Sequence, residues 1–75
     1  MKCLNLAIQE VENLESGEVF LVKDLFKGYE WNRLDTGERR SLGALFLKKV
    51  RHDDLQTVVE VGLKSSANQQ QYIKK

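Results

Sequence analysis

The sequence predicts an α+β fold, in which three helical segments pack on a small sheet. Apolar residues recur at helical spacing near the start and in the middle of the chain, and β-branched residues cluster near its C-terminal end. A short apolar segment at residues 18–22 lies between the two helical regions and is too isolated to be stable alone. We therefore expect it to join two C-terminal strands in a three-stranded antiparallel sheet.

The first helix is predicted by a periodic apolar series near the N-terminus. Glutamates and polar residues occupy the positions between the apolar ones, as on an amphipathic helix. Gly17 is expected to end this helix, because glycine adopts a left-handed conformation without a Cβ penalty. The predicted inward residues are Leu4, Ala7, Ile8, Val11 and Leu14.

The segment EVFLV, residues 18–22, predicts a short strand that is buried on both faces. Asp24 is then expected to cap a helical turn, which Gly28 ends. Tyr29, Trp31 and Leu34 continue the apolar series as an irregular second helix. Aromatic residues could stack on nucleic-acid bases, but just before a core helix they are more typical of the core.

The helix from residue 37 to residue 52 has the clearest signals. Asp35 and Glu38 have the spacing of a capping box, with Asp35 as the N-cap. Gly43 lies inside this helix and costs about 1 kcal/mol relative to alanine. We therefore expect a neighbouring segment to approach it closely. The predicted core face comprises Leu42, Leu45, Phe46 and Val50.

The C-terminal part predicts a β-hairpin. Residues 57–63 are rich in valine, with Val59, Val61 and Leu63 expected on one side, and residues 71–75 return as a second strand. The whole order is helix, strand, helical turn, helix, strand, loop, strand. This is the order of a winged helix-turn-helix, with the hairpin as the wing.

The length of 75 residues predicts a single domain, residues 1–75, with a marginal core. A chain of this size buries only about 60% of the surface that its unfolded form exposes. Cys3 is the single cysteine, so an internal disulfide is excluded, and one histidine adds too little for a structural zinc site. We expect no metal or cofactor, and we expect tight packing, a homodimer or both.

Composition also indicates where the protein acts. No apolar run approaches the roughly 20 residues of a membrane span. Glutamates interrupt the N-terminal segment, unlike the continuous apolar region of a signal peptide. A lone thiol fits a reducing compartment. The sequence therefore predicts a cytoplasmic protein with no membrane partner.

Positive charge is concentrated in the later part of the chain. Residues 1–30 carry three lysines and six acids, a balance of −3, whereas residues 31–75 carry nine Lys or Arg and five acids, a balance of +4. The net charge is only +1. This asymmetry indicates one side that faces a polyanion.

The segment EVFLVKDLFKGYEWNRLDTGERRSLGALFLKKV, about half of the chain, resembles a small family of uncharacterised single-domain proteins from Gram-positive bacteria and their mobile elements. An F-x-x-x-D-L-F segment, a tryptophan, an arginine and an L-G-x-x-F segment carry the resemblance. The resemblance implies a bacterial, winged-helix-like domain and no particular activity. The matching residues here are Phe20, Asp24, Leu25, Phe26, Trp31, Arg40, Leu42, Gly43 and Phe46.

The outward face of helix 37–52 is the candidate nucleic-acid-binding surface, together with the wing at residues 64–69. A recognition helix needs small or polar residues for close approach, and Arg or Lys to bond bases and phosphates. A solvated charged face is the plainer interpretation. Leu47 is expected outside, against a thymine methyl or in a dimer contact. The predicted binding residues are Arg39, Arg40, Ser41, Ala44, Lys48, Arg51, Lys64, Asn68 and Gln69.

These features favour a small regulator that binds double-stranded DNA as a homodimer. The alternative is a protein-interaction adaptor of the same fold, with acidic residues of the first helix and Leu47 as its partner surface. A continuous positive face joining helix and wing would favour DNA, and interruption by acids such as Glu38 or Asp53 would favour a protein. An enzyme is not expected, because His52 and Asp53 are sequence neighbours that do not face each other on a helix.

Overall fold

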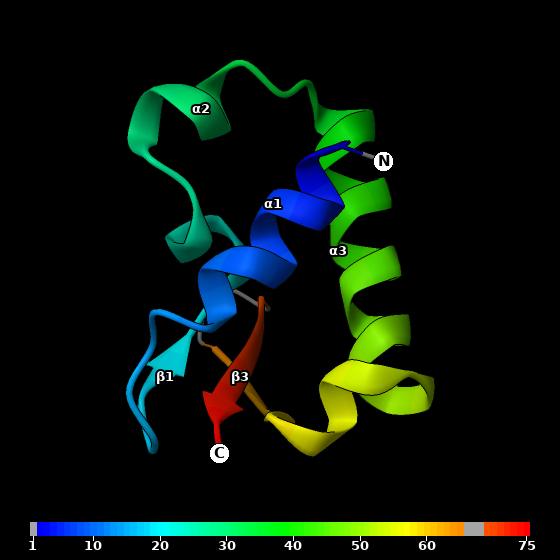
Figure 1. Ribbon diagram of the computed structural model, residues 1–75. Helices are drawn as coiled ribbons and strands as arrows, with labels where there is room; N and C mark the ends of the chain where they lie inside the picture. The colour runs from blue at the N-terminus through cyan, green and yellow to red at the C-terminus, as the bar shows by residue number, and fades with distance from the viewer. Residues whose placement is uncertain (1, 66–68) are drawn as a thin grey trace.

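The computed structural model describes residues 2–65 and 69–75. It confirms an α+β fold of three α-helices and a three-stranded antiparallel sheet (Figure 1). Short 3-10 turns η1 and η2 lie before α2 and after α3. The elements are α1 (Lys2–Val11), β1 (Val19–Phe20), η1 (Val22–Leu25), α2 (Gly28–Asn32), α3 (Thr36–His52), η2 (Asp54–Thr57), β2 (Val59–Lys64) and β3 (Gln70–Lys74).

The sheet has the order β1-β3-β2, so the last strand in the sequence is the central one. Phe20 pairs with Tyr72 on one side of β3, and Val61 pairs with Tyr72 on the other. The predicted joining of residues 18–22 to the C-terminal hairpin is therefore confirmed for β1. Element order and sheet order are both consistent with a winged helix, in which the β2–β3 hairpin is the wing.

The core lies between α1, α3 and the sheet, and aromatic rings form its centre. The ring of Phe46 meets that of Tyr72 edge to face, with 5.0 Å between centroids, and that of Phe20 at 6.4 Å. Burial raises the pKa of the Tyr72 hydroxyl, and the positive charge of Arg51 partly opposes this. The buried apolar residues are Leu4, Ala7, Val11, Phe20, Leu25, Leu42, Phe46, Val50, Leu55, Val59 and Tyr72.

The capping box at the start of α3 is confirmed. The Glu38 backbone N–H donates to Asp35 Oδ1 at 2.7 Å, and the Asp35 N–H donates to Glu38 Oε1 at 3.1 Å. These bonds satisfy backbone donors that have no partner within the helix. The helix begins at Thr36, one residue before the predicted start, and ends at His52 as expected.

The first helix is shorter than predicted. Its buried side matches the expected series, with Leu4, Ala7 and Val11 buried, but α1 ends at Val11. Gly17 does have a left-handed conformation, at φ +90°, but it serves the turn into β1. Its N–H donates to the Lys74 carbonyl at 2.7 Å, so a tertiary hydrogen bond fixes the turn.

The prediction of a five-residue strand at 18–22 is wrong in length and burial. Only Val19 and Phe20 are in β1, and the Val19 side chain is 58% exposed. The chain then enters η1, where the Asp24 carboxylate accepts the Leu21 N–H at 2.9 Å. Asp24 is therefore the third residue of the turn and not its N-cap.

The expected one-sided pattern of β2 is broken by an irregularity in the β2–β3 pairing between Val61 and Lys64. Val59 is buried and Val61 is half-buried, but Leu63 is 85% exposed. Within this irregular stretch the Gln70 side-chain amide donates to the Gly62 carbonyl at 2.6 Å. The predicted alternation fails because the irregularity shifts the residues that follow it.

The two C-terminal lysines have structural partners. The Lys74 ammonium donates to the carbonyl of Val11 at 3.1 Å, and that of Lys75 donates to the carbonyl of Gln56 at 2.8 Å. Both carbonyls lie at or near helix ends, where positive charge is favourable. Among the described residues, no helix is long and apolar enough to cross a membrane.

Candidate nucleic-acid interface

The exposed side of α3 carries most of the predicted contact residues. Their side chains reach solvent along the helix, whose 17 residues span about 25 Å. The exposed predicted residues of α3 are Arg40, Ser41, Ala44, Lys48 and Arg51. Arg39 is half-buried.

The inward side of α3 differs from the prediction at two positions. Leu42, Phe46 and Val50 are buried as expected, but Leu45 is 38% exposed. Leu47, which was expected outside, is partly buried against the core. Both leucines lie on the flanks of the buried stripe, and of the two Leu47 is the one that packs against the core.

An open groove of about 570 Å³ runs between α3, η1 and the β2–β3 hairpin. It brings together five of the predicted residues, from two elements that are distant in the sequence: Arg39, Arg40, Ala44, Lys64 and Gln69. Ser41, Lys48 and Arg51 are not among its lining residues. Asn68 lies outside the described residues.

The groove is positively charged. Lys23, Arg39, Arg40 and Lys64 line it, and no carboxylate does among the residues that the structure describes. The only ion pair within the described ranges joins Lys49 to Asp53 at 3.7 Å, so these four cations have no carboxylate partner there. The groove therefore presents unneutralised positive charge to solvent.

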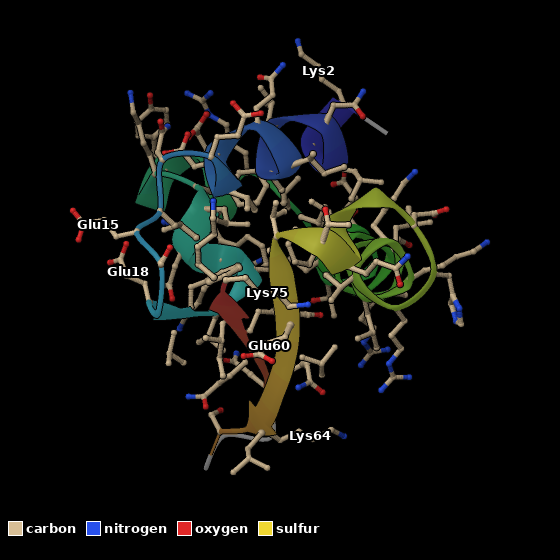
Figure 2. All side chains as sticks on the ribbon, turned by 60° about the horizontal axis from the view of Figure 1, so that its bottom comes forward. Lys2, Glu15, Glu18, Glu60, Lys64 and Lys75 are labelled. Atoms are coloured by element: carbon tan, nitrogen blue, oxygen red, sulfur yellow. The ribbon has the colours of Figure 1, made fainter. Side chains whose placement is uncertain are left out.

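The acidic residues of the N-terminal part lie elsewhere. Figure 2 shows Lys64 at the tip of the β2–β3 hairpin, whereas Glu15 and Glu18 lie on the loop after α1, at a different edge of the molecule. Glu38 and Asp35 are engaged in the capping box of α3. Glu15 and Glu18 thus lie away from the hairpin tip that carries Lys64, whereas Glu60 lies on β2 of the same hairpin.

Arg39 forms part of the groove wall. Its Nη2 donates to the Trp31 carbonyl at 3.1 Å, and its guanidinium lies 5.1 Å from the centre of the Trp31 ring. Its Nε is buried and has no hydrogen-bond partner in the described part of the chain. Trp31 also contacts the Phe26 ring, with 5.9 Å between centroids. Trp31 thus packs on the core as expected and orients a cation.

Several lining residues were not predicted. Lys23 was missed because nothing local relates η1 to α3, and Gln70 was taken as part of the turn between the two predicted C-terminal strands. Tyr29 was expected in the core but is 54% exposed, with the Arg33 guanidinium 4.9 Å from its ring centre. The exposed Tyr29 is not a groove residue.

Gly43 faces the groove, and the predicted close approach of a neighbouring segment is wrong. A methyl group at this position would meet no atom within 4 Å. We therefore expect Gly43→Ala to raise the free energy of unfolding by about 0.5–1 kcal/mol, since alanine is the better helix former. Urea denaturation followed by circular dichroism measures this.

The control for Gly43→Ala is Gly17→Ala, which is expected to destabilise the protein because φ is +90° at that position. A loss of stability on Gly43→Ala would mean that the helix needs glycine here for packing after all.

The fold and the groove define a small α+β protein with an unneutralised cationic groove between a helix and a β-hairpin. The chain belongs to the family described as a domain of unknown function, DUF1413, whose model matches residues 5–74. The expected membership of a small family without an assigned activity is thereby confirmed. Comparison with curated proteins and with solved structures gives no match.

Proposed function

We propose that this chain is a winged-helix protein that binds double-stranded DNA through α3 and the β2–β3 hairpin. The observation that supports this most is the groove between these two elements, which four cations line and no described carboxylate interrupts. DNA-binding affinity comes largely from lysines and arginines that replace counterions at phosphates. Charge therefore favours DNA at this face although the net charge is only +1.

The shape of α3 also supports the proposal. Ser41 and Ala44 are small and exposed, so the backbone of α3 can approach base edges in a major groove about 12 Å wide. Arg40 and Lys48 extend on either side of Ala44 and reach bases or phosphates. Lys64, at the hairpin tip, contacts a flanking phosphate in this arrangement.

The proposal also covers the protein's role and assembly. We propose a cytoplasmic regulator or accessory factor that acts as a homodimer and has no enzymatic activity of its own. A second copy would double the number of phosphate contacts, which compensates for the small charge of one chain. Within the described residues, no group of three or more His, Cys, Asp or Glu side chains is placed to hold a metal.

Salt-titrated binding of the protein to a labelled duplex tests the proposal. The logarithm of the binding constant should fall linearly with the logarithm of salt concentration, with a slope of about −0.9 for each phosphate contact. We expect Arg40→Ala and Lys48→Ala each to weaken binding and to reduce the slope by about 0.9. Unchanged affinity and slope in both variants would exclude α3 as the contact surface.

A protein-interaction adaptor is the second candidate. The apolar residues that line the groove, here called its apolar floor, include Leu21, Trp31 and Leu47. This floor and the 85% exposed Leu63 favour the adaptor, because neither is needed for phosphate contacts. An acidic segment with apolar side chains would fit such a surface. Binding of a protein partner would persist in salt that abolishes DNA binding, because apolar burial is not screened.

A further inference from the structure

The groove between α3, η1 and the hairpin combines two kinds of surface. Its floor is apolar and includes Leu21, Trp31 and Leu47, while the cations Lys23, Arg40 and Lys64 line it as well. A DNA backbone would use the cations, but it would leave the apolar floor in contact with water. The combination suits a smaller molecule that has an apolar body and a negative charge.

We propose that this groove binds a small amphipathic anion, with a flat apolar body and a carboxylate, sulfonate or phosphate group. The binding site itself is independent of the DNA-binding proposal. Only its consequence rests on that proposal: a ligand held beside Arg40 and Lys64 competes with DNA for the same cations. The groove would then be the place where a ligand regulates DNA binding.

The space fits the apolar body of such a ligand. About 570 Å³ lies within the range of roughly 300–1,000 Å³ that small-molecule sites occupy. Gly43 and Ala44 form the α3 wall and have no long side chains to fill this space. The Trp31 ring lines the groove and adds apolar surface for such a body. Enclosing an apolar body here removes apolar area of both molecules from water.

The charged groups fit the anionic head. Lys23 lines the groove from η1, Arg40 from α3 and Lys64 from the hairpin, so three elements contribute cations to one groove. The buried Nε of Arg39 has no partner among the described residues, although the same guanidinium is held by the Trp31 carbonyl. A buried donor without an acceptor is rare in folded proteins. Because Arg39 lines the groove, a small shift of its side chain would let an anionic oxygen accept from this N–H.

A pair of dyes tests the site. The probe is 8-anilinonaphthalene-1-sulfonate, and N-phenyl-1-naphthylamine has the same rings without the sulfonate. Trp31 is the single tryptophan of the chain and lines the groove, so its fluorescence reports an occupant directly. We expect the sulfonate to quench Trp31 emission saturably and to bind more tightly than the neutral dye.

Charge-removing variants make the test specific. The double variant Lys23→Ala/Arg40→Ala should weaken binding of the sulfonate by about tenfold or more, the loss of one or two charge-assisted contacts. Binding of the neutral dye should change less than about twofold, since the apolar floor is intact. The matched control is Lys2→Ala/Arg33→Ala, which removes one lysine and one arginine outside the groove and should leave both affinities unchanged.

Unfolded chains bind such dyes nonspecifically. Thermal unfolding of each variant is therefore measured, to show that it is folded at the assay temperature. Equal affinity for the two dyes, or equal loss of both in the Lys23/Arg40 variant, would overturn the proposal. So would unchanged Trp31 emission with the sulfonate where duplex DNA quenches it, which would assign the whole groove to DNA. Dye binding without any DNA binding would support the site and overturn the proposed function alone.

Discussion

Replacement of Phe46 by alanine is expected to lower the free energy of unfolding by about 3–5 kcal/mol. The Phe46 side chain has no exposed surface, and its ring contacts those of Tyr72 and Phe20 at the centre of the core. A domain of this size has a total stability of only about 4–11 kcal/mol. Phe46→Ala should therefore leave much of the protein unfolded at 37 °C, as denaturant titration and circular dichroism would show.

The neighbouring Leu45 provides the matched control. It lies on the same helix, but its side chain is 38% exposed and outside the buried core. Leu45→Ala should cost less than about 1 kcal/mol, as expected for a surface position. Similar losses at both positions would mean that Leu45 is covered in solution, as in a dimer contact, and a dependence of stability on protein concentration would identify that contact.

Reversal of charge on α3 is expected to have the largest effect on DNA binding. Arg40→Glu/Lys48→Glu should lower the affinity for duplex DNA by more than about 100-fold near physiological salt, because two phosphate contacts become repulsions. Both side chains are exposed and neither has an ion pair within the described residues, so the fold should tolerate the change. Fluorescence anisotropy measures the affinity, and circular dichroism verifies the fold.

The control for charge reversal changes the net charge by the same amount elsewhere. Lys2→Glu/Arg33→Glu also lowers the net charge by four units, but outside the groove, and should reduce affinity by only a few-fold through long-range repulsion. If both double variants lose affinity equally, DNA responds to net charge and α3 is not the contact surface. If neither loses affinity, a protein partner becomes the better explanation of the groove.

The parts of the fold that local chemistry determines could be predicted from the sequence. The capping box of Asp35 and Glu38 uses residues three positions apart, so both its bonds and the start of α3 were predictable to within one residue. The buried stripe of Leu42, Phe46 and Val50 likewise follows from helical periodicity alone. Burial of the residues beside such a stripe depends on which segments pack against them. Helical periodicity therefore could not predict that Leu47 is partly buried and Leu45 is exposed.

The candidate site was only half predictable for a related reason. Arg40, Ala44 and Lys48 could be assigned to the outward side of α3 because they share that helix. Lys23 could not be assigned, because its position in the groove depends on where the chain places η1 after the two-residue strand β1. That no carboxylate of the described residues lines the groove is also a tertiary property, because no local pattern places Glu15 or Glu18 on a separate edge.

The central position of β3 has a consequence for the order in which this protein folds. In this sheet β1 and β2 each pair with β3 and not with each other, so the sheet cannot form before β3 is in place. The hydrogen bond from the Lys74 ammonium to the Val11 carbonyl joins residues that are 63 positions apart. Closing so long a loop costs chain entropy before the contacts that compensate for this cost can form. Folding is therefore expected to be one cooperative step, in which β3 assembles the helices and both outer strands around itself.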